Sequence, residues 1–387
     1  MCHGSRRPAR GAGRGVTLVS IALLAVPGCS KHPTRPGGPS ELHGTPVTPA
    51  NAVEVAGPML WSGLTGELIC SGPFRAGGGL IAVHATTGAT RTLDSLESFP
   101  EALAPGGSVV YYDAIESDVY DLSVLARRVA LGRTPAPHTL ESCSGFCFHF
   151  IEPAPDGDLL AVGELSDSLR IYRLSTGERT VVSEYSPLAF SPHSDLLLVK
   201  DLFDPLGQAR ILTLATGSTT PAALGVPDTI SGFRLRWGPA GIEVLYVGGD
   251  NKSFFLRRVE AGATLRLWAS PDTLDGYPIA WSSSGTRAAL WSYRPSGTTA
   301  APARRWELHL VDLVARTVRT VAYAEVAVES TPRPSPIARF RSAANIFPTP
   351  TLGGLAFSPD ESELAYTFFD GRIYRSRVAD ALATAAR

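Results

Sequence analysis

Charged side chains gather in the segments between hydrophobic runs, and they are the groups in this sequence best suited to hold a ligand. Two long segments, residues 293–305 and 326–351, contain six arginines against one carboxylate, Glu329. These arginines are Arg294, Arg304, Arg305, Arg333, Arg339 and Arg341. Shorter segments are acidic and include Asp113, Asp201, Asp250 and Asp370. Such charges bind charged peptides, glycans or proteins, although solvated turn residues without a ligand have the same composition.

The sequence contains no motif with the spacing of a known catalytic site. A nucleophile elbow, a zinc-protease helix motif, a phosphate-binding loop and a dinucleotide fingerprint are all missing. Beyond His3, the histidines occur singly, at positions 32, 43, 84, 138, 149, 193 and 309. We therefore expect no bound metal, no cofactor and no enzymatic activity. The alternative is a site built from single side chains that are dispersed along the sequence.

Two cysteines have the spacing of a local cross-link. Cys143 and Cys147 are separated by Ser-Gly-Phe in a predicted loop, and exported proteins form disulfides. A metal site is a poorer explanation, because no second cysteine pair or histidine cluster completes four ligands. Cys70 lies in a hydrophobic strand pattern, which predicts a buried and unreactive side chain.

The N-terminus has the features of an export signal. Four arginines in the first 14 residues precede an apolar run at residues 16–26, which is too short to span a bilayer. The run ends in Val-Pro-Gly-Cys-Ser, which resembles the bacterial lipobox, and this resemblance implies that Cys29 is lipidated. Pro27 departs from the small residue usual at that place, so cleavage nearby without lipidation is the alternative. Residues 31–49 are rich in Pro, Gly and Thr, which indicates a flexible tether.

Composition indicates a globular all-β protein. The chain has 387 residues, of which 44% are hydrophobic, enough for a buried core. Its 38 glycines and 31 prolines suit a fold with many tight turns. The net charge of −1 gives no reason to expect nucleic-acid binding. We expect a monomer that contacts the membrane only through its lipid anchor.

A short phrase recurs along the chain: a hydrophobic strand, a Pro-Asp-Gly-like turn and a second hydrophobic strand. The copies begin at Trp61, Ala104, Ala154, Ser191, Gly238, Ser282 and Ser358. The best copy continues into two more short strands, and four strands every 40 to 50 residues or so are typical of a β-propeller blade. The sequence therefore predicts seven blades, with six or eight as alternatives. Residues 47–55 are expected to supply the outer strand of the last blade and so close the ring.

The turn phrase and the Ser-Thr-Gly hairpins that follow it resemble the TolB-like, WD-repeat-like propellers of bacterial envelopes. The segments 154–157 and 358–360 match the phrase best, whereas 191–194 and 238–241 have drifted. The resemblance covers about residues 52–378 and implies a scaffold rather than a chemistry. TolB itself has a separate N-terminal α/β domain, for which the stretch before the first repeat is too short, so we do not expect an orthologue.

Blade topology sorts the connections onto two faces. The turn phrases join the first strand of each blade to the second and lie on one face, the turn face. Second-to-third connections, and those that lead to the next blade, lie on the opposite face, the loop face. Residues 133–147, 293–305 and 326–351 are predicted to be long loops there. We therefore expect an acidic loop face with one basic lobe, and structural roles for Asp156 and Asp360 in the turn phrases.

These observations predict a signal peptide at residues 1–28, a tether at 29–50, a propeller at 51–378 and a tail at 379–387. We expect a lipid-anchored envelope protein, at the periplasmic face of the outer membrane or at the cell surface. Its expected function is that of a non-enzymatic binding or assembly scaffold for an envelope protein, peptide or glycan. The alternative is a lyase, lactonase or cyclase with a central site on the loop face. An enzyme requires His, Asp or Glu side chains that converge at the ring axis.

Overall fold

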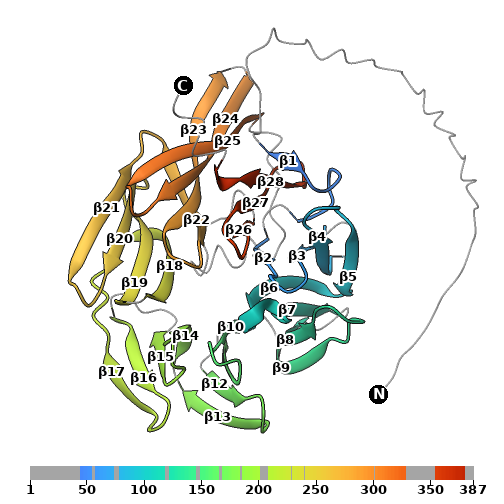
Figure 1. The fold of residues 1–387 in the computed structure, drawn as a ribbon, viewed down its shortest axis with the longest axis vertical. Coiled ribbons are helices and arrows are strands. Elements are labelled where there is room, and N and C mark those ends of the chain that lie inside the picture. Colours follow the sequence, from blue (N-terminus) through green and yellow to red (C-terminus); the bar gives the residue numbers. More distant parts are fainter. Residues whose placement is uncertain are drawn as a thin grey trace, which may run out of the picture. The chain divides into compact units, whose positions relative to one another are not determined.

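The chain divides into two compact units, Met1–Pro39 and Ser40–Arg387, and the second unit folds as a ring of β-sheets. The structure is a computed structural model that describes residues 44–54, 57–73, 78–117, 122–144, 149–164, 168–183, 185–200, 208–227, 229–238, 240–299, 301–327 and 354–379. These described residues form seven four-stranded antiparallel sheets (Figure 1). The predicted all-β fold with seven blades is confirmed. Among the described residues, no helix is long and apolar enough to cross a membrane.

In blades 1 to 3 the strands follow one another in chain order. Blade 1 contains β2 (Met59–Trp61), β3 (Glu67–Ser71), β4 (Leu80–His84) and β5 (Thr90–Asp94). Blade 2 contains β6 (Glu97–Leu103), β7 (Val109–Ser117), β8 (Leu122–Ala130) and β9 (His138–Ser144), with a 3-10 turn at Pro105–Gly107. Blade 3 contains β10 (His149–Pro153), β11 (Leu159–Glu164), β12 (Ser168–Arg173) and β13 (Glu178–Ser183).

Blades 4 to 6 have the same strand order. Blade 4 contains β14 (Ser186–Phe190), β15 (Leu196–Lys200), β16 (Arg210–Thr213) and β17 (Ser218–Pro221). Blade 5 contains β18 (Ile230–Gly238), β19 (Gly241–Gly248), β20 (Ser253–Arg258) and β21 (Ala263–Ala269). Blade 6 contains β22 (Thr273–Trp281), β23 (Arg287–Thr298), β24 (Ala301–Asp312) and β25 (Thr317–Ala327). The first strand of each blade contacts the first strands of its neighbours, so these strands form the inner wall of the ring.

Blade 7 combines the two ends of the described chain. Its inner strands are β26 (Leu355–Phe357), β27 (Glu363–Thr367) and β28 (Ile373–Arg377), and its outer strand is β1 (Thr45–Pro46). The Val47 N–H continues the pairing by donating to the Ile373 carbonyl oxygen at 2.8 Å, and the buried Thr48 Oγ1 accepts from the Ile373 N–H at 2.9 Å. The N-terminal chain therefore closes the ring as predicted. The paired strand, Thr45–Pro46, however, lies just before the predicted segment 47–55 and within the residues predicted as tether.

The turn phrase is stabilised by its own polar side chains. In blade 3 the Asp156 carboxylate accepts from the N–H groups of Asp158 and Leu159, at 2.9 and 3.2 Å. Gly157, which follows Asp156 in the turn, has a φ of 77°, a conformation that glycine adopts without a steric penalty. In blade 7 the Asp360 carboxylate accepts from the hydroxyl group of Ser358 at 2.6 Å. These contacts agree with the structural role predicted for both aspartates.

Two of the predicted long loops are largely strand, which corrects the sequence analysis. Within residues 133–147, β9 forms the outer strand of blade 2, and the connection before it joins a third strand to a fourth, on the turn face. Residues 293–305 lie in β23 and β24, whose pairing continues to Thr298 and Ala301. The prolines, glycine and arginines of this segment obscure the alternation of apolar and polar residues that is typical of strands. The segment nevertheless forms strands, because β23 and β24 pair with each other along its whole described length except the turn. Of the third segment, residues 328–353 lie outside the described residues.

Candidate functional site

Blade 6 has the longest strands of the ring. β23, β24 and β25 have 12, 12 and 11 residues, whereas the inner strand β22 begins at Thr273, opposite Tyr293. Beyond that pair the three strands continue without the inner strand. We call this extension the arm and define it as residues 293–298, 301–306 and 323–327. Figure 1 shows the β23–β24 hairpin projecting from the ring.

Strand pairing gives the arm two different faces. Tyr293 pairs with Trp306, which pairs in turn with Ala324, so these side chains share one face. The next rung places Arg294 opposite Arg305, on the other face. One face of the arm is therefore mainly aromatic, with Arg304 on it as well, whereas the other face carries Arg294 and Arg305.

The charged face combines two predicted binding residues with carboxylates. Arg294 is 46% exposed and lies 3.6 Å from Asp272 and 3.7 Å from Glu307. The Arg305 Nε donates to Glu307 at 2.6 Å, and its guanidinium lies 4.2 Å from the centre of the Tyr323 ring. Glu307 thus lies between two like charges that would otherwise repel across the ladder. The described part of the lobe is therefore less basic than expected, because strand pairing brings in carboxylates from outside the predicted loops.

The aromatic face anchors the arm to blade 7. The Arg304 guanidinium lies 5.2 Å from the centre of the Tyr293 ring, so this predicted arginine is held by a cation–π contact. The Tyr293 ring lies 4.8 Å from that of Trp306, which in turn lies 5.5 Å from that of Phe369 in blade 7. Trp306 and the neighbouring Trp291 are fully buried. This stack of rings holds the base of the arm in one orientation.

One predicted acidic residue is not on the surface. Asp113 lies within β7 and is fully buried. One carboxylate oxygen lies 2.9 Å from His149 Nδ1, and the other accepts from the His149 N–H at 3.1 Å. The pair therefore links blade 2 to blade 3. The prediction that Asp113 belongs to an exposed loop site is wrong, because the hydrophobic strand pattern continues through it.

Two other predicted aspartates lie in loop-face turns that they themselves stabilise. Asp250 is exposed, and its carboxylate accepts from the N–H groups of Lys252 and Ser253, both at 2.9 Å. These bonds, together with one from the Ser253 hydroxyl, lower the pKa of Asp250. Asp370 accepts from the Tyr374 hydroxyl at 2.7 Å. Neither aspartate contacts the arm through any interaction found among the described residues.

The other predicted site residues fall outside the described part of the chain. They are Cys29, Cys147, Asp201, Arg339 and Arg341. Cys143 lies in β9 and is disulfide-bonded. Because Cys147 is outside the described residues, the pairing of Cys143 with Cys147 stays a prediction. Cys70 is a free thiol whose burial raises its pKa to about 12, as expected of an unreactive core residue.

A serine and a histidine approach each other in blade 6 in a manner that resembles a nucleophile and its base. Ser292 Oγ lies 2.7 Å from His309 Nε2, and burial lowers the pKa of the imidazole to about 4. The hydroxyl of Thr320 lies 3.3 Å from the second ring nitrogen. Ser292 is fully buried, however, so a substrate has no access to its oxygen. We assign this cluster a structural role.

The sequence analysis missed two charged residues on the inner wall. Glu152 of β10 is partly buried, and burial raises its pKa to about 8 against the opposing effects of Arg234 and a hydrogen bond from the Phe190 backbone. Arg234 of β18 is exposed, and its Nε donates to the Ile279 carbonyl oxygen at 3.2 Å. Charged residues within the first strands of blades are the sequence signal that could have identified both.

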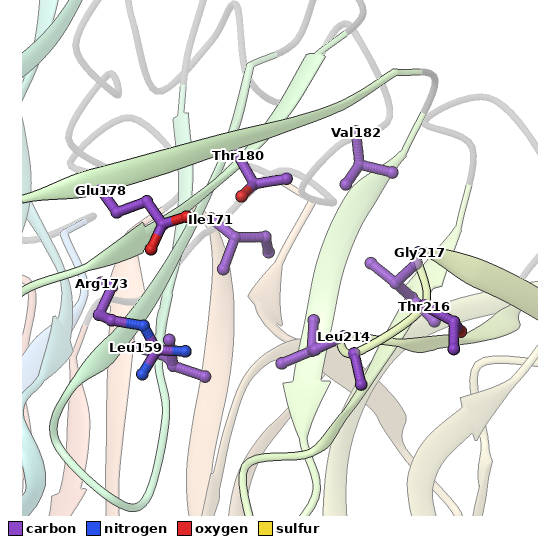
Figure 2. A pocket seen from close by; sticks show the side chains of 11 residues that line it. Leu159, Ile171, Arg173, Glu178, Thr180, Val182, Leu214, Thr216 and Gly217 are labelled. Atoms are coloured by element: carbon purple, nitrogen blue, oxygen red, sulfur yellow. The ribbon is translucent and has the colours of Figure 1, made fainter.

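A groove of about 420 Å³ opens between blades 3 and 4 (Figure 2). Leu159, Ile171 and Leu212 form its apolar floor, and all three are nearly buried. Arg173 and Glu178 belong to its exposed rim. None of the predicted binding residues lines this groove.

The comparisons with known proteins concern the fold. An oligogalacturonate lyase from Vibrio parahaemolyticus matches with a TM-score of 0.55 and 10% identity, over 86% of this chain and 93% of that chain. An oligogalacturonate lyase in complex with manganese matches with a TM-score of 0.57 and 13% identity, over 86% of this chain and 92% of that one. TolB from Acinetobacter baumannii matches with a TM-score of 0.40 and 12% identity, over 73% of this chain and 65% of that chain. No protein-family model and no curated protein matches the sequence.

Proposed function

We propose that the protein is an exported β-propeller that binds an envelope protein, peptide or glycan through the arm of blade 6, as a scaffold rather than a catalyst. The arm is the single observation that carries this proposal. Its strands are longer than the blade needs for packing, and it presents arginine and tyrosine, which are enriched at protein interfaces. The ring of blades provides a rigid base for it.

The N-terminal sequence supports the proposed location. A basic segment, a short apolar run and Cys29 in a lipobox-like context together favour export and lipid anchoring. The residues between Cys29 and the closing strand β1 would then separate the ring from the membrane surface. An arm on a tethered ring can reach partners in the envelope without crossing the membrane.

Site-specific crosslinking in intact cells tests this function. A photoreactive residue at Thr299, in the turn that joins β23 to β24 at the end of the arm, should give a discrete crosslinked adduct. The same residue at Val314, which is 75% exposed in a turn-face hairpin of the same blade, serves as the control and should give none. Identical adducts from both positions, or none from Thr299, would contradict the proposal.

A shortened arm adds a second measurement. Tyr293 and Trp306 are direct cross-strand partners, so residues 294–305 can be replaced by Asn-Gly, a dipeptide that forms two-residue hairpin turns. The shortened protein should keep its thermal stability and lose the partner identified by crosslinking. A crosslinked partner that still binds the shortened protein would show that the arm is not the docking element.

The enzymatic alternative rests on the fold that the chain shares with two oligogalacturonate lyases. Within the described residues, no group of three or more His, Cys, Asp or Glu side chains is placed to hold a metal ion. Incubation with oligogalacturonate, with and without added manganese, tests the alternative directly. Ultraviolet absorbance from a new carbon–carbon double bond in the product would establish lyase activity and displace the scaffold proposal.

A further inference from the structure

The groove between blades 3 and 4 lies where the outer strands of blade 4 are shorter than those of blade 3. β12 and β13 have six residues each, whereas β16 and β17 have four each. The hairpin at residues 214–217, between β16 and β17, forms the wall on the side of blade 4. Figure 2 shows Thr180 and Val182 of β13 above the groove and Leu214 and Gly217 of this hairpin to its right. Blade 4 therefore leaves part of the facing surface of blade 3 uncovered.

The wall on the side of blade 3 is a strand whose alternate side chains line the groove. Glu178, Thr180 and Val182 lie on one side of β13, because alternate residues of a strand point to the same face. At about 3.3 Å per residue, this row extends over about 13 Å from Glu178 to Val182. Ile171 pairs with Thr180 in the ladder and continues the same face toward the floor. The row has the spacing of alternate side chains in an extended peptide.

The floor of the groove is aliphatic. Leu159, Ile171 and Leu212 are at most 8% exposed and belong to one apolar cluster that spans both blades. Val182 and Leu214 pack against this cluster and are only partly buried. Among the described residues no aromatic side chain lines the groove, so it offers aliphatic contacts and no ring face for a sugar.

The rim of the groove has a net negative charge. Arg173 lies opposite Glu178 in the ladder, but its guanidinium contacts Asp158 at 3.0 Å instead. Glu178 is exposed and forms no ion pair within the described part of the chain. Two carboxylates therefore accompany one arginine. A carboxylate or phosphate ligand would be repelled at the Glu178 end, whereas a lysine or arginine side chain would be attracted.

We propose that this groove binds an extended peptide segment of a partner protein, with two aliphatic side chains at alternate positions and a basic residue at the Glu178 end. The aliphatic side chains remove the partly exposed floor from water. The basic residue supplies the counterion that Glu178 lacks. The groove volume of about 420 Å³ lies within the range of ligand-binding clefts, about 300–1,000 Å³.

Selection from a library of short random peptides displayed on phage tests the groove, with the full-length protein as the target. The selected peptides should be enriched in Leu, Ile or Val at alternate positions, with Lys or Arg beside them. Failure to enrich any peptide, or enrichment of acidic peptides, would overturn the proposal.

A side chain that fills the groove shows where the selected peptide binds. Thr180→Trp places a large ring over the floor and should weaken binding at least about tenfold in fluorescence anisotropy. Val181→Trp is the matched control, because Val181 is 55% exposed on the other face of the same strand. It should leave the affinity unchanged. Equal losses in two variants that both melt like the native protein would contradict binding in the groove.

The charge preference has its own test. Glu178→Gln should weaken the selected peptide about two- to fivefold, the usual effect of losing one exposed ion pair. Glu260→Gln, at an exposed position in a turn-face hairpin of blade 5, is the control and should change nothing. Decanoate, an aliphatic chain with a carboxylate, should not displace the peptide. Displacement by decanoate, or an unchanged affinity in Glu178→Gln, would contradict the proposed basic peptide.

The groove is separate from the arm. It lies beside hairpins that join third strands to fourth strands on the turn face, whereas the arm extends from the loop face. The protein with the shortened arm should therefore bind the selected peptide as the native protein does. A Thr299 crosslink without any groove-dependent peptide would refute the peptide site and leave the scaffold function intact. Groove-dependent binding without a Thr299 crosslink would refute the arm and leave the peptide site intact.

Discussion

The Asp113–His149 pair shows how a buried charge can join two blades. Both side chains have no exposed surface, and the aspartate accepts from the backbone N–H as well as facing the imidazole ring. His149 is the first residue of β10, so these bonds fix the point at which blade 3 begins. Leaving one member of such a pair buried alone is costly, because its desolvation is no longer compensated.

Asp113→Ala should therefore lower the free energy of unfolding by about 3–5 kcal/mol. Urea denaturation monitored by tryptophan fluorescence measures this change. Glu116→Ala, at an exposed position of the same strand, is the matched control and should change the free energy by less than about 0.5 kcal/mol. Equal effects of the two substitutions would argue against a specific role for the buried pair.

His309 predicts how the ring responds to acid. Burial lowers its pKa to about 4, whereas an unfolded histidine titrates near 6.5. Between these values the unfolded chain binds a proton that the folded chain does not, so stability falls as the pH drops from about 6.5 to 4. The loss from this residue is at most about 3 kcal/mol.

Urea denaturation at several pH values between about 4 and 7 measures that dependence. His309→Gln should flatten it, because glutamine does not titrate. His138→Gln, at an exposed position of β9, should leave the dependence as it is in the native protein. A profile unchanged by His309→Gln would contradict the assignment.

At the scale of single elements, the arm shows where sequence patterns stop being informative. The turn phrases were recognisable because each has a fixed chemistry, a proline followed by a small or acidic residue and a glycine. β23 and β24 lack that regularity, since Pro295 and Gly297 interrupt them and arginines replace apolar residues. Their order comes from the ladder of pairs between the two strands, which involves residues up to 25 positions apart. Pairing between residues so far apart cannot be recognised from a short stretch of sequence.

The same argument applies to the candidate site. Arg294, Arg304 and Arg305 could be selected from the sequence because they cluster there. Asp272 and Glu307, which lie against Arg294, could not, because strand pairing is what brings these carboxylates near that residue.

β1 is the shortest strand of the ring and depends on few bonds. The Thr48 side chain is buried and accepts from the Ile373 N–H, so it extends the ladder beyond the paired residues. Thr48→Val should lower the free energy of unfolding by about 1–3 kcal/mol, because a buried donor loses its acceptor. Urea denaturation measures the loss. Thr45→Val, at an exposed position of β1, should have almost no effect, and a larger change there than at Thr48 would contradict this explanation.

For the whole molecule, closure of the ring makes the N-terminal segment part of the fold. The segment before Ser40 lies outside the ring unit, whereas Thr48 and Val53 are buried within it. A protein that begins at Ser40 should melt at the same temperature as one that begins at Cys29. A protein that begins at Glu54 should melt at least about 5 °C lower, because blade 7 then lacks its outer strand.

Differential scanning calorimetry compares these proteins, and equal melting temperatures for all three would show that β1 adds nothing to stability.

The seven-bladed ring itself could be predicted because the same pattern recurs in every blade, so that the weak signal of any one blade matters little. The closing strand could be located only to within two residues, since its sequence carries no copy of the turn phrase.

The position of the closing strand also determines how the ring responds to mechanical load. A force applied upstream of Thr45 reaches the two paired residues of β1 before it reaches any other strand. β28 also pairs with β27, so the remaining strands of blade 7 stay paired when β1 separates from β28. Stretching the chain from its N-terminal side is therefore expected to peel away one short strand first and leave the other six blades intact.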